Sequence, residues 1–184
     1  MLTNSPDRYG TVARALHWTI ALLILALIPL GWYMSGLDYY DPAYRWAPSL
    51  HRSTGLLVLV LALVRIAWAL LDRAPPLAAS LKPWERLGAK LGHRVLYLMT
   101  VLIPVSGYLV STADGHPVQV FGLFELPALL TVDEAVAEVF DSAHVLFAWG
   151  TLAVVVVHAA AALKHQLIDR DGTLSRMAGR APRR

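Results

Sequence analysis

Histidine is the residue type in this sequence that can carry chemistry, because several imidazoles stand inside long apolar runs. Imidazole is a common metal ligand. Inside a membrane span it is costly and uncommon, so each such histidine calls for a partner. The absence of cysteine excludes disulfides, thiolate metal sites, iron–sulfur clusters and covalent c-type haem attachment. The seven histidines are His17, His51, His93, His116, His144, His158 and His165.

His144 and His158 lie 14 residues apart in the sequence. On an α-helix this spacing is within about 40° of four complete turns, so the two side chains share one face. They are separated by about 21 Å along the helix axis. One metal ion cannot bridge that distance, whereas two stacked sites, each with one of these histidines, fit within it. The spacing therefore predicts two separate metal-centred groups, such as two haems.

Apolar segments long enough to cross a membrane must position these histidines. The chain has 184 residues, of which 57% are hydrophobic and 16% are charged, whereas soluble domains average about 25% charged residues. A spanning helix needs roughly 20 apolar residues. We therefore predict an all-α integral membrane four-helix bundle, a single domain over residues 1–184, with a short amphipathic helix at 132–140. The predicted spanning helices cover residues 14–34, 49–71, 91–111 and 142–167.

Lysine and arginine predict the orientation of this bundle. The N-terminal segment, residues 65–94 and the chain from residue 164 onward contain 14 of the 16 basic residues, and the opposite side contains Arg45 and Arg52. Cytoplasmic loops are enriched in Lys and Arg, so both termini are expected in the cytoplasm. The basic residues flank apolar spans, so we expect membrane lipid as a partner and no nucleic acid.

Depth in the membrane predicts how the histidines pair. The first helix begins in the cytoplasm, so His17 lies at the depth of His158 near the end of the fourth helix. The second helix begins outside, so His51 lies at the depth of His144. Two neutral imidazoles suit a low-spin, six-coordinate iron with no open position, which favours electron transfer over oxygen binding. The alternative is that each histidine is a hydrogen-bonding core residue.

For other polar residues near the membrane surfaces, the sequence allows more than one role. His93 lies at about the depth of His17 and His158, so it could replace one of them, bind a haem propionate or line a quinone pocket. His165 shares a helix face with His158, and a solvated interfacial position is the more ordinary reading. Arg65 is expected to extend toward the headgroups, and we assign no role to His116. The cations expected to pair with anionic haem propionates are Arg14, Arg52 and Arg94, which are otherwise ordinary positive flanks.

Four stretches of the sequence resemble the bacterial cytochrome b561 family. The opening Arg-Tyr-Gly-x-x-x-Arg-x-Leu-His-Trp ends at His17 and Trp18, and His51 is followed by Ser-Thr-Gly one residue later. The third helix contains Gly-His-Arg, and the most specific stretch is His158-Ala-Ala-Ala-Ala-Leu-Lys-His165, followed by Asp-Gly-Thr-Leu and Arg-Met. The resemblance covers nearly the whole chain.

The resemblance implies a membrane oxidoreductase with two haem b groups in the bacterial inner membrane. It implies that the iron ligands are His17, His51, His144 and His158, in agreement with the pairs that depth predicts. Members of the family exchange electrons with membrane quinone, so ubiquinone is the expected acceptor. Some members take electrons from superoxide at the periplasmic face. Related b-type subunits instead serve larger hydrogenase or dehydrogenase complexes, which remains an alternative.

The sequence leaves the quinone site and the electron donor open. Quinone candidates are Lys164, His165 and His93 on the cytoplasmic side, and Trp46 and Arg52 on the outer side. Attraction of an anion such as superoxide calls for positive potential, yet the outer segments contain eight acidic residues against two arginines. Two further alternatives are a divalent-metal transporter, which would be expected to place acids among the ligands within the spans, and an assembly partner of a respiratory complex.

Overall fold

Four long helices dominate the computed structural model of the chain, which describes residues 1–180. Each is long and apolar enough to cross a membrane. A two-stranded hairpin and a short fifth helix complete the fold. The elements, in chain order, are α1 Thr11–Met34, α2 Trp46–Leu71, α3 Pro83–Thr112, β1 Val118–Val120, β2 Phe124–Leu126, α4 Glu134–Leu167 and α5 Thr173–Met177.

The four predicted spans are present, but all of them begin earlier than the sequence predicts, α1 and α2 by three residues and α3 and α4 by eight. Helix α3 begins at Pro83 rather than at residue 91, because proline suits the first helical position and the Glu85 carboxylate accepts the Lys82 N–H at 2.9 Å. Helix α4 begins at Glu134, where Asp133 caps it by accepting the Val136 N–H at 3.0 Å. The predicted separate helix at 132–140 is therefore wrong: residues 134–140 form the first turns of α4.

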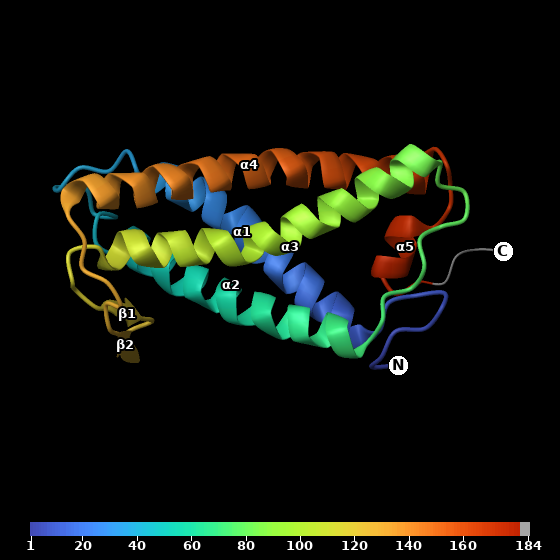
Figure 1. The fold of residues 1–184 in the computed structure, drawn as a ribbon, viewed down its shortest axis with the longest axis horizontal. Coiled ribbons are helices and arrows are strands. Elements are labelled where there is room, and N and C mark those ends of the chain that lie inside the picture. Colours follow the sequence, from blue (N-terminus) through green and yellow to red (C-terminus); the bar gives the residue numbers. More distant parts are fainter. Residues whose placement is uncertain (181–184) are drawn as a thin grey trace.

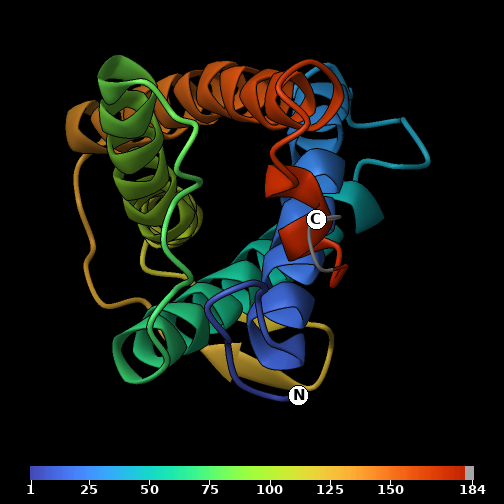
Figure 2. The ribbon, with the colours of Figure 1, turned by 90° about the vertical axis from the view of Figure 1, so that its right-hand side faces the viewer.

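The helices form one elongated bundle, and the two ends of the described chain lie at the same end of it (Figure 1). We call this the terminal end, where α5 also lies, and we call the opposite end the hairpin end, after β1 and β2. The helices that pack closely along the chain are α1 with α2, α2 with α3, and α3 with α4. Viewed from the terminal end, the four long helices surround a common centre (Figure 2). Residues buried within the bundle are mostly small, and they include Ile20, Val58, Ala62, Ser106 and Thr151.

The hairpin is an element that the sequence does not predict, because each strand has only three residues. The strands are antiparallel, and Val118 lies opposite Leu126. A turn in which Phe121 and Gly122 both have positive φ angles, 50° and 72°, joins them. Ser53 on α2 holds the hairpin: its hydroxyl accepts the Phe121 N–H at 2.9 Å and donates to the Gln119 carbonyl at 3.3 Å. The hairpin is thus fixed to α2 two residues after His51.

The terminal end is closed by hydrogen bonds between segments that are distant in sequence. The Asn4 N–H donates to the Asp72 carboxylate at 2.9 Å, which joins the N-terminal segment to the end of α2. The Arg176 guanidinium donates to the carbonyls of Pro6, Asp7 and Pro76 at 2.8–3.0 Å. These contacts give a structural role to the C-terminal Arg-Met motif, which clamps the N-terminal segment against the α2–α3 connection.

Candidate functional site

The hairpin-end cluster is built around two imidazoles that face one another. His51 on α2 and His144 on α4 have ring centroids 6.2 Å apart and ring planes at 78°. Two imidazoles that bind one metal from opposite sides, each at about 2.0 Å, have ring centres roughly 6 Å apart. The spacing therefore fits one metal between the two rings, and the pair is the one that membrane depth predicts.

Hydrogen bonds define which nitrogen of His144 carries the proton. Its Nδ1 lies 3.1 Å from the Ile103 carbonyl oxygen and 3.1 Å from the Ser106 hydroxyl. A carbonyl can only accept, so Nδ1 is the donor and Nε2 keeps its lone pair. In contrast, the buried Nδ1 of His51 has no hydrogen-bond partner within residues 1–180. The cluster thus has one imidazole oriented by the backbone of α3, which is a common arrangement for metal-binding histidines.

A glycine on a neighbouring helix makes room for each ring of this cluster. A Cβ atom at Gly31 on α1 would lie 3.0 Å from Cε1 of His51. A Cβ atom at Gly107 on α3 would lie 2.9 Å from Cε1 of His144. Contacts this close require the ring to shift. The two glycines therefore set the positions of both imidazoles by shape.

The terminal-end cluster contains three imidazoles. His17 on α1 and His158 on α4 have ring centroids 6.4 Å apart, with ring planes at 64°. This separation again fits one metal between the rings. His93 on α3 lies even closer to His158, at 5.4 Å between centroids. The structure thus brings together the predicted pair and also its predicted rival.

Arg65 joins this cluster, and the expectation that it extends to the headgroups is wrong. Its Nη1 lies 2.9 Å from His17 Nδ1, and its Nε donates to the Tyr97 hydroxyl at 3.3 Å. The guanidinium carbon lies 5.2 Å from the centre of the Tyr97 ring, within cation–π range. The sequence does not predict this role, because an arginine near the end of an apolar helix is ordinarily explained by extension of its side chain to the headgroups.

Both clusters connect helices that are not close neighbours. Helix α4 packs against α3 and α5 among the described elements, yet its two histidines face α1 and α2. Each pair therefore spans the middle of the bundle, one toward each end. A metal-centred group held by either pair would lie between α4 and a helix that it does not pack against closely.

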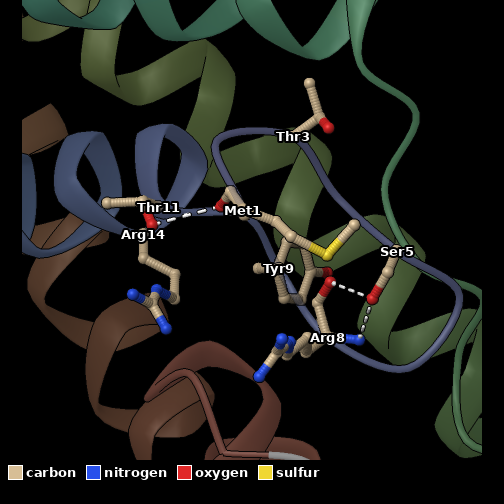
Figure 3. A pocket seen from close by; sticks show the side chains of 8 residues that line it. Met1, Thr3, Ser5, Arg8, Tyr9, Thr11 and Arg14 are labelled. Carbon is tan, nitrogen blue, oxygen red and sulfur yellow. Dashed lines mark hydrogen bonds between the residues drawn. The ribbon is translucent and has the colours of Figure 1, made fainter.

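The three arginines predicted to pair with propionates lie in different surroundings. Arg14 lines a small cavity of about 150 Å³ formed by the N-terminal segment (Figure 3) and packs against Gly179, whose φ is +84°. Arg52 is exposed, and its Nε donates to the Pro48 carbonyl of its own helix at 3.2 Å. Arg94 is exposed on α3. Of the arginines on the long helices, Arg65 is the one with a hydrogen bond to a histidine of a cluster in the described residues.

Lys164 and His165 belong to a charged network at the terminal end. Lys164 Nζ lies 2.6 Å from Glu85 and 2.7 Å from Asp169. His165 is buried, so its reading as a solvated interfacial residue is wrong, and its Nδ1 lies 2.8 Å from Asp169 and 2.9 Å from Asp171. Carboxylates accept, so His165 donates from Nδ1 and presents Nε2. The Lys164 ammonium lies between Glu85 and Asp169 and takes the place that a metal ion would occupy between these two acids.

Asp171 anchors this network to the segment after α4. Burial raises its pKa, but hydrogen bonds from the Thr173 hydroxyl and N–H, together with His165 and Ser80, bring the pKa below its ordinary value. The carboxylate is therefore charged across the neutral range. Asp171 thus contacts both His165 and Thr173, which is the first residue of α5.

The donor groups of both clusters fit an iron porphyrin. Each provides two imidazoles at the separation that one metal requires. At the hairpin end, the buried Nδ1 of His51 has no hydrogen-bond partner in the described residues, and Gly31 leaves room beside this ring. The chain matches the family described as prokaryotic cytochrome b561 over residues 8–180.

Curated relatives align with almost the full chain. Cytochrome b561 homolog 2 of Escherichia coli is 42% identical over 179 residues, covering 97% of this chain and 95% of the relative. The probable superoxide oxidase CybB of Yersinia pestis is 30% identical over 172 residues, covering 92% and 95%. Cytochrome b561 homolog 1 of Escherichia coli is 25% identical over 175 residues, covering 93% and 97%.

Proposed function

The chain belongs to the prokaryotic cytochrome b561 family, and we propose that it is a diheme cytochrome that passes electrons from a periplasmic donor to membrane ubiquinone. Membership makes it a membrane b-type cytochrome of electron transport. The number of haems, the donor, the acceptor and the inner-membrane location are the proposed part. Under this proposal the terminal end faces the cytoplasm, in keeping with its excess of Lys and Arg.

The ligand sets follow from the two histidine pairs. His51 and His144 hold one haem at the hairpin end, and His17 and His158 hold the other at the terminal end. When bound, the haems would supply one-electron redox chemistry. The chain's residues orient the imidazoles: the Ile103 carbonyl keeps the proton of His144 on Nδ1, which leaves Nε2 for the metal.

A single observation carries this proposal: two imidazole pairs with centroid separations of 6.2 and 6.4 Å, at opposite ends of one bundle. The test is the dithionite-reduced minus oxidised spectrum of the purified protein, together with its haem-to-protein ratio. We expect two b-type haems per chain, falling to one in His144→Ala. His116→Ala, in an exposed loop, is the matched control and should keep both. A protein that acquires no haem despite adequate supply would contradict the proposal.

Ubiquinone is proposed to bind at the terminal end, beside Lys164 and His165. Reduction of ubiquinone to ubiquinol takes two electrons and two protons. His165 presents Nε2 while Asp169 and Asp171 hold Nδ1, and Lys164 is a fixed donor next to it. These side chains can orient a quinone carbonyl and deliver protons from the cytoplasmic side. A His165→Ala variant should keep both haems but lose quinone reduction.

Superoxide is the proposed donor at the hairpin end. Two superoxide ions oxidised to dioxygen would release the two electrons that one ubiquinone takes up. Arg52 lies next to His51 and is exposed, so it offers local positive charge on a side with many acids. Stopped-flow mixing of the oxidised protein with superoxide tests this step. Fast haem reduction that slows in Arg52→Gln is expected, and absence of fast reduction would sink the superoxide assignment alone.

A further inference from the structure

Arg65 is a cation inside a membrane span, and the described residues offer it no carboxylate partner. It is half-buried on α2, six residues before the helix ends at Leu71 and therefore about 9 Å from that end. Its polar contacts are the His17 imidazole and the Tyr97 hydroxyl. A charge at this depth is costly unless it is paired. Its placement calls for an anion at the terminal-end cluster.

The hydrogen bond to His17 shows what such an anion would replace. A guanidinium can only donate, so His17 Nδ1 accepts and the neutral ring carries its proton on Nε2. Binding a metal through Nε2 requires that proton to sit on Nδ1 instead. Nδ1 can then no longer accept from Arg65. The guanidinium needs another acceptor within reach, and a haem carries two propionate carboxylates.

We propose that Arg65 pairs with a propionate of the terminal-end haem and raises the reduction potential of that haem above the potential of the other. This inference rests on the proposed function, because it requires a haem between His17 and His158. A positive charge beside the site favours the reduced iron, which has one positive charge less. Loss of the charge leaves a propionate uncompensated, which disfavours reduction in the same direction.

The hairpin-end cluster has no equivalent of Arg65 among the hydrogen bonds of the described residues. Its imidazoles contact a carbonyl, a serine hydroxyl and two glycines. Arg52, the nearest arginine in sequence, is exposed and bonded to Pro48. The asymmetry in charge biases electrons toward the terminal end, which is the direction from an outer donor to a cytoplasmic-side quinone.

The experiment is a spectroelectrochemical titration of the haem-loaded protein, with each haem assigned by loss of its signal in His144→Ala or in a His17→Ala/His93→Ala double variant. In Arg65→Gln we expect the reduction potential of the terminal-end haem to fall. At a fixed potential its ratio of oxidised to reduced form should rise at least tenfold, which corresponds to about 59 mV for one electron. The hairpin-end haem should stay unchanged. Arg65→Lys, which keeps the charge, should retain most of the wild-type potential of the terminal-end haem.

Arg73→Gln is the matched control, because it removes an exposed arginine from the same end of the bundle. It should leave both potentials unchanged. Loss of the terminal-end haem in Arg65→Gln but not in Arg65→Lys would also support charge pairing. An unchanged terminal-end potential in a two-haem Arg65→Gln protein overturns the inference, as does equal haem loss in both Arg65 variants. Absence of haem from the wild-type protein would instead defeat the proposed function.

Discussion

The two histidine clusters have almost the same separation between their paired rings, 6.2 and 6.4 Å, but different surroundings. At the hairpin end, close contacts with two glycines and a hydrogen bond to one backbone carbonyl position the rings. At the terminal end, a guanidinium, a tyrosine and a third imidazole crowd the pair. If each pair holds a haem, as proposed, these unlike surroundings would give the two haems different properties.

The largest expected difference between the clusters concerns the loss of a ligand. His51→Ala should remove the hairpin-end haem completely, because that pair has no third imidazole among its recorded ring contacts. His17→Ala should keep part of the terminal-end haem, because His93 lies 5.4 Å from His158 and can take the empty position. Haem-to-protein ratios measure both effects.

A His17→Ala/His93→Ala double variant tests the source of that retention. In this double variant the haem content at the terminal end should be as low as the haem content at the hairpin end in His51→Ala. Equal haem content in His17→Ala and His51→Ala would remove the distinction between the clusters.

A methyl group added at Gly107 should harm the hairpin-end cluster selectively. Gly107→Ala places a Cβ 2.9 Å from the His144 ring, and overpacking of this kind costs about 1–3 kcal/mol. Haem affinity at that end should fall by roughly tenfold or more, measured by transfer of haem to an apo-acceptor. Gly92→Ala, on the same helix with no atom within 4 Å of the added Cβ, is the control. If both variants behave alike, the close approach of Gly107 has no role.

Acid should loosen the terminal end before the hairpin end. The Asp171 pKa is depressed, so its stabilising contribution is present above the unfolded value of about 3.9 and is lost as pH falls through the lower folded value. Hydrogen bonds to a charged group are worth about 1.5–3 kcal/mol. The protection of amides around Thr173 from hydrogen exchange, relative to the unfolded chain at the same pH, should fall below about pH 4, and Asp171→Asn should lose the same protection already at neutral pH.

The hairpin end also has a carboxylate with a lowered pKa, Asp114, held by the His116 N–H and imidazole. Both partners are exposed, so solvent screens the pair and its loss should matter little. Exchange at the hairpin that increases as much as exchange at Thr173 would mean that charge supports both ends equally.

The smallest expected effect is at Ser106. Its hydroxyl lies 3.1 Å from His144 Nδ1, but the Ile103 carbonyl is at the same distance and remains in Ser106→Ala. The loss should be about 0.5–1 kcal/mol, seen as a small weakening of haem binding with no change at the terminal end. A large loss would show that the hydroxyl, rather than the carbonyl, orients the imidazole.

The sequence was sufficient for the spans and for the histidine pairs, because hydropathy and helical depth depend on residue order alone. His17 and His158 could be matched by counting residues from the ends of two helices. The sequence was insufficient for Arg65, whose role depends on which face of α2 meets α1 and α3. The partners of Gly107 and Ser53 depend likewise on packing between helices, and the hairpin strands are too short to leave a period in the pattern.

Helix α4 contributes a histidine to each cluster, and it is the last of the long helices in the chain. His17 precedes its partner His158 by 141 residues, and His51 precedes its partner His144 by 93 residues. During synthesis the first three spans can enter the membrane with their imidazoles in place, but neither pair exists until α4 follows. Under the proposed ligand sets, haem loading would therefore be a late event in biogenesis, and a chain that ends before residue 144 would be unable to complete either site.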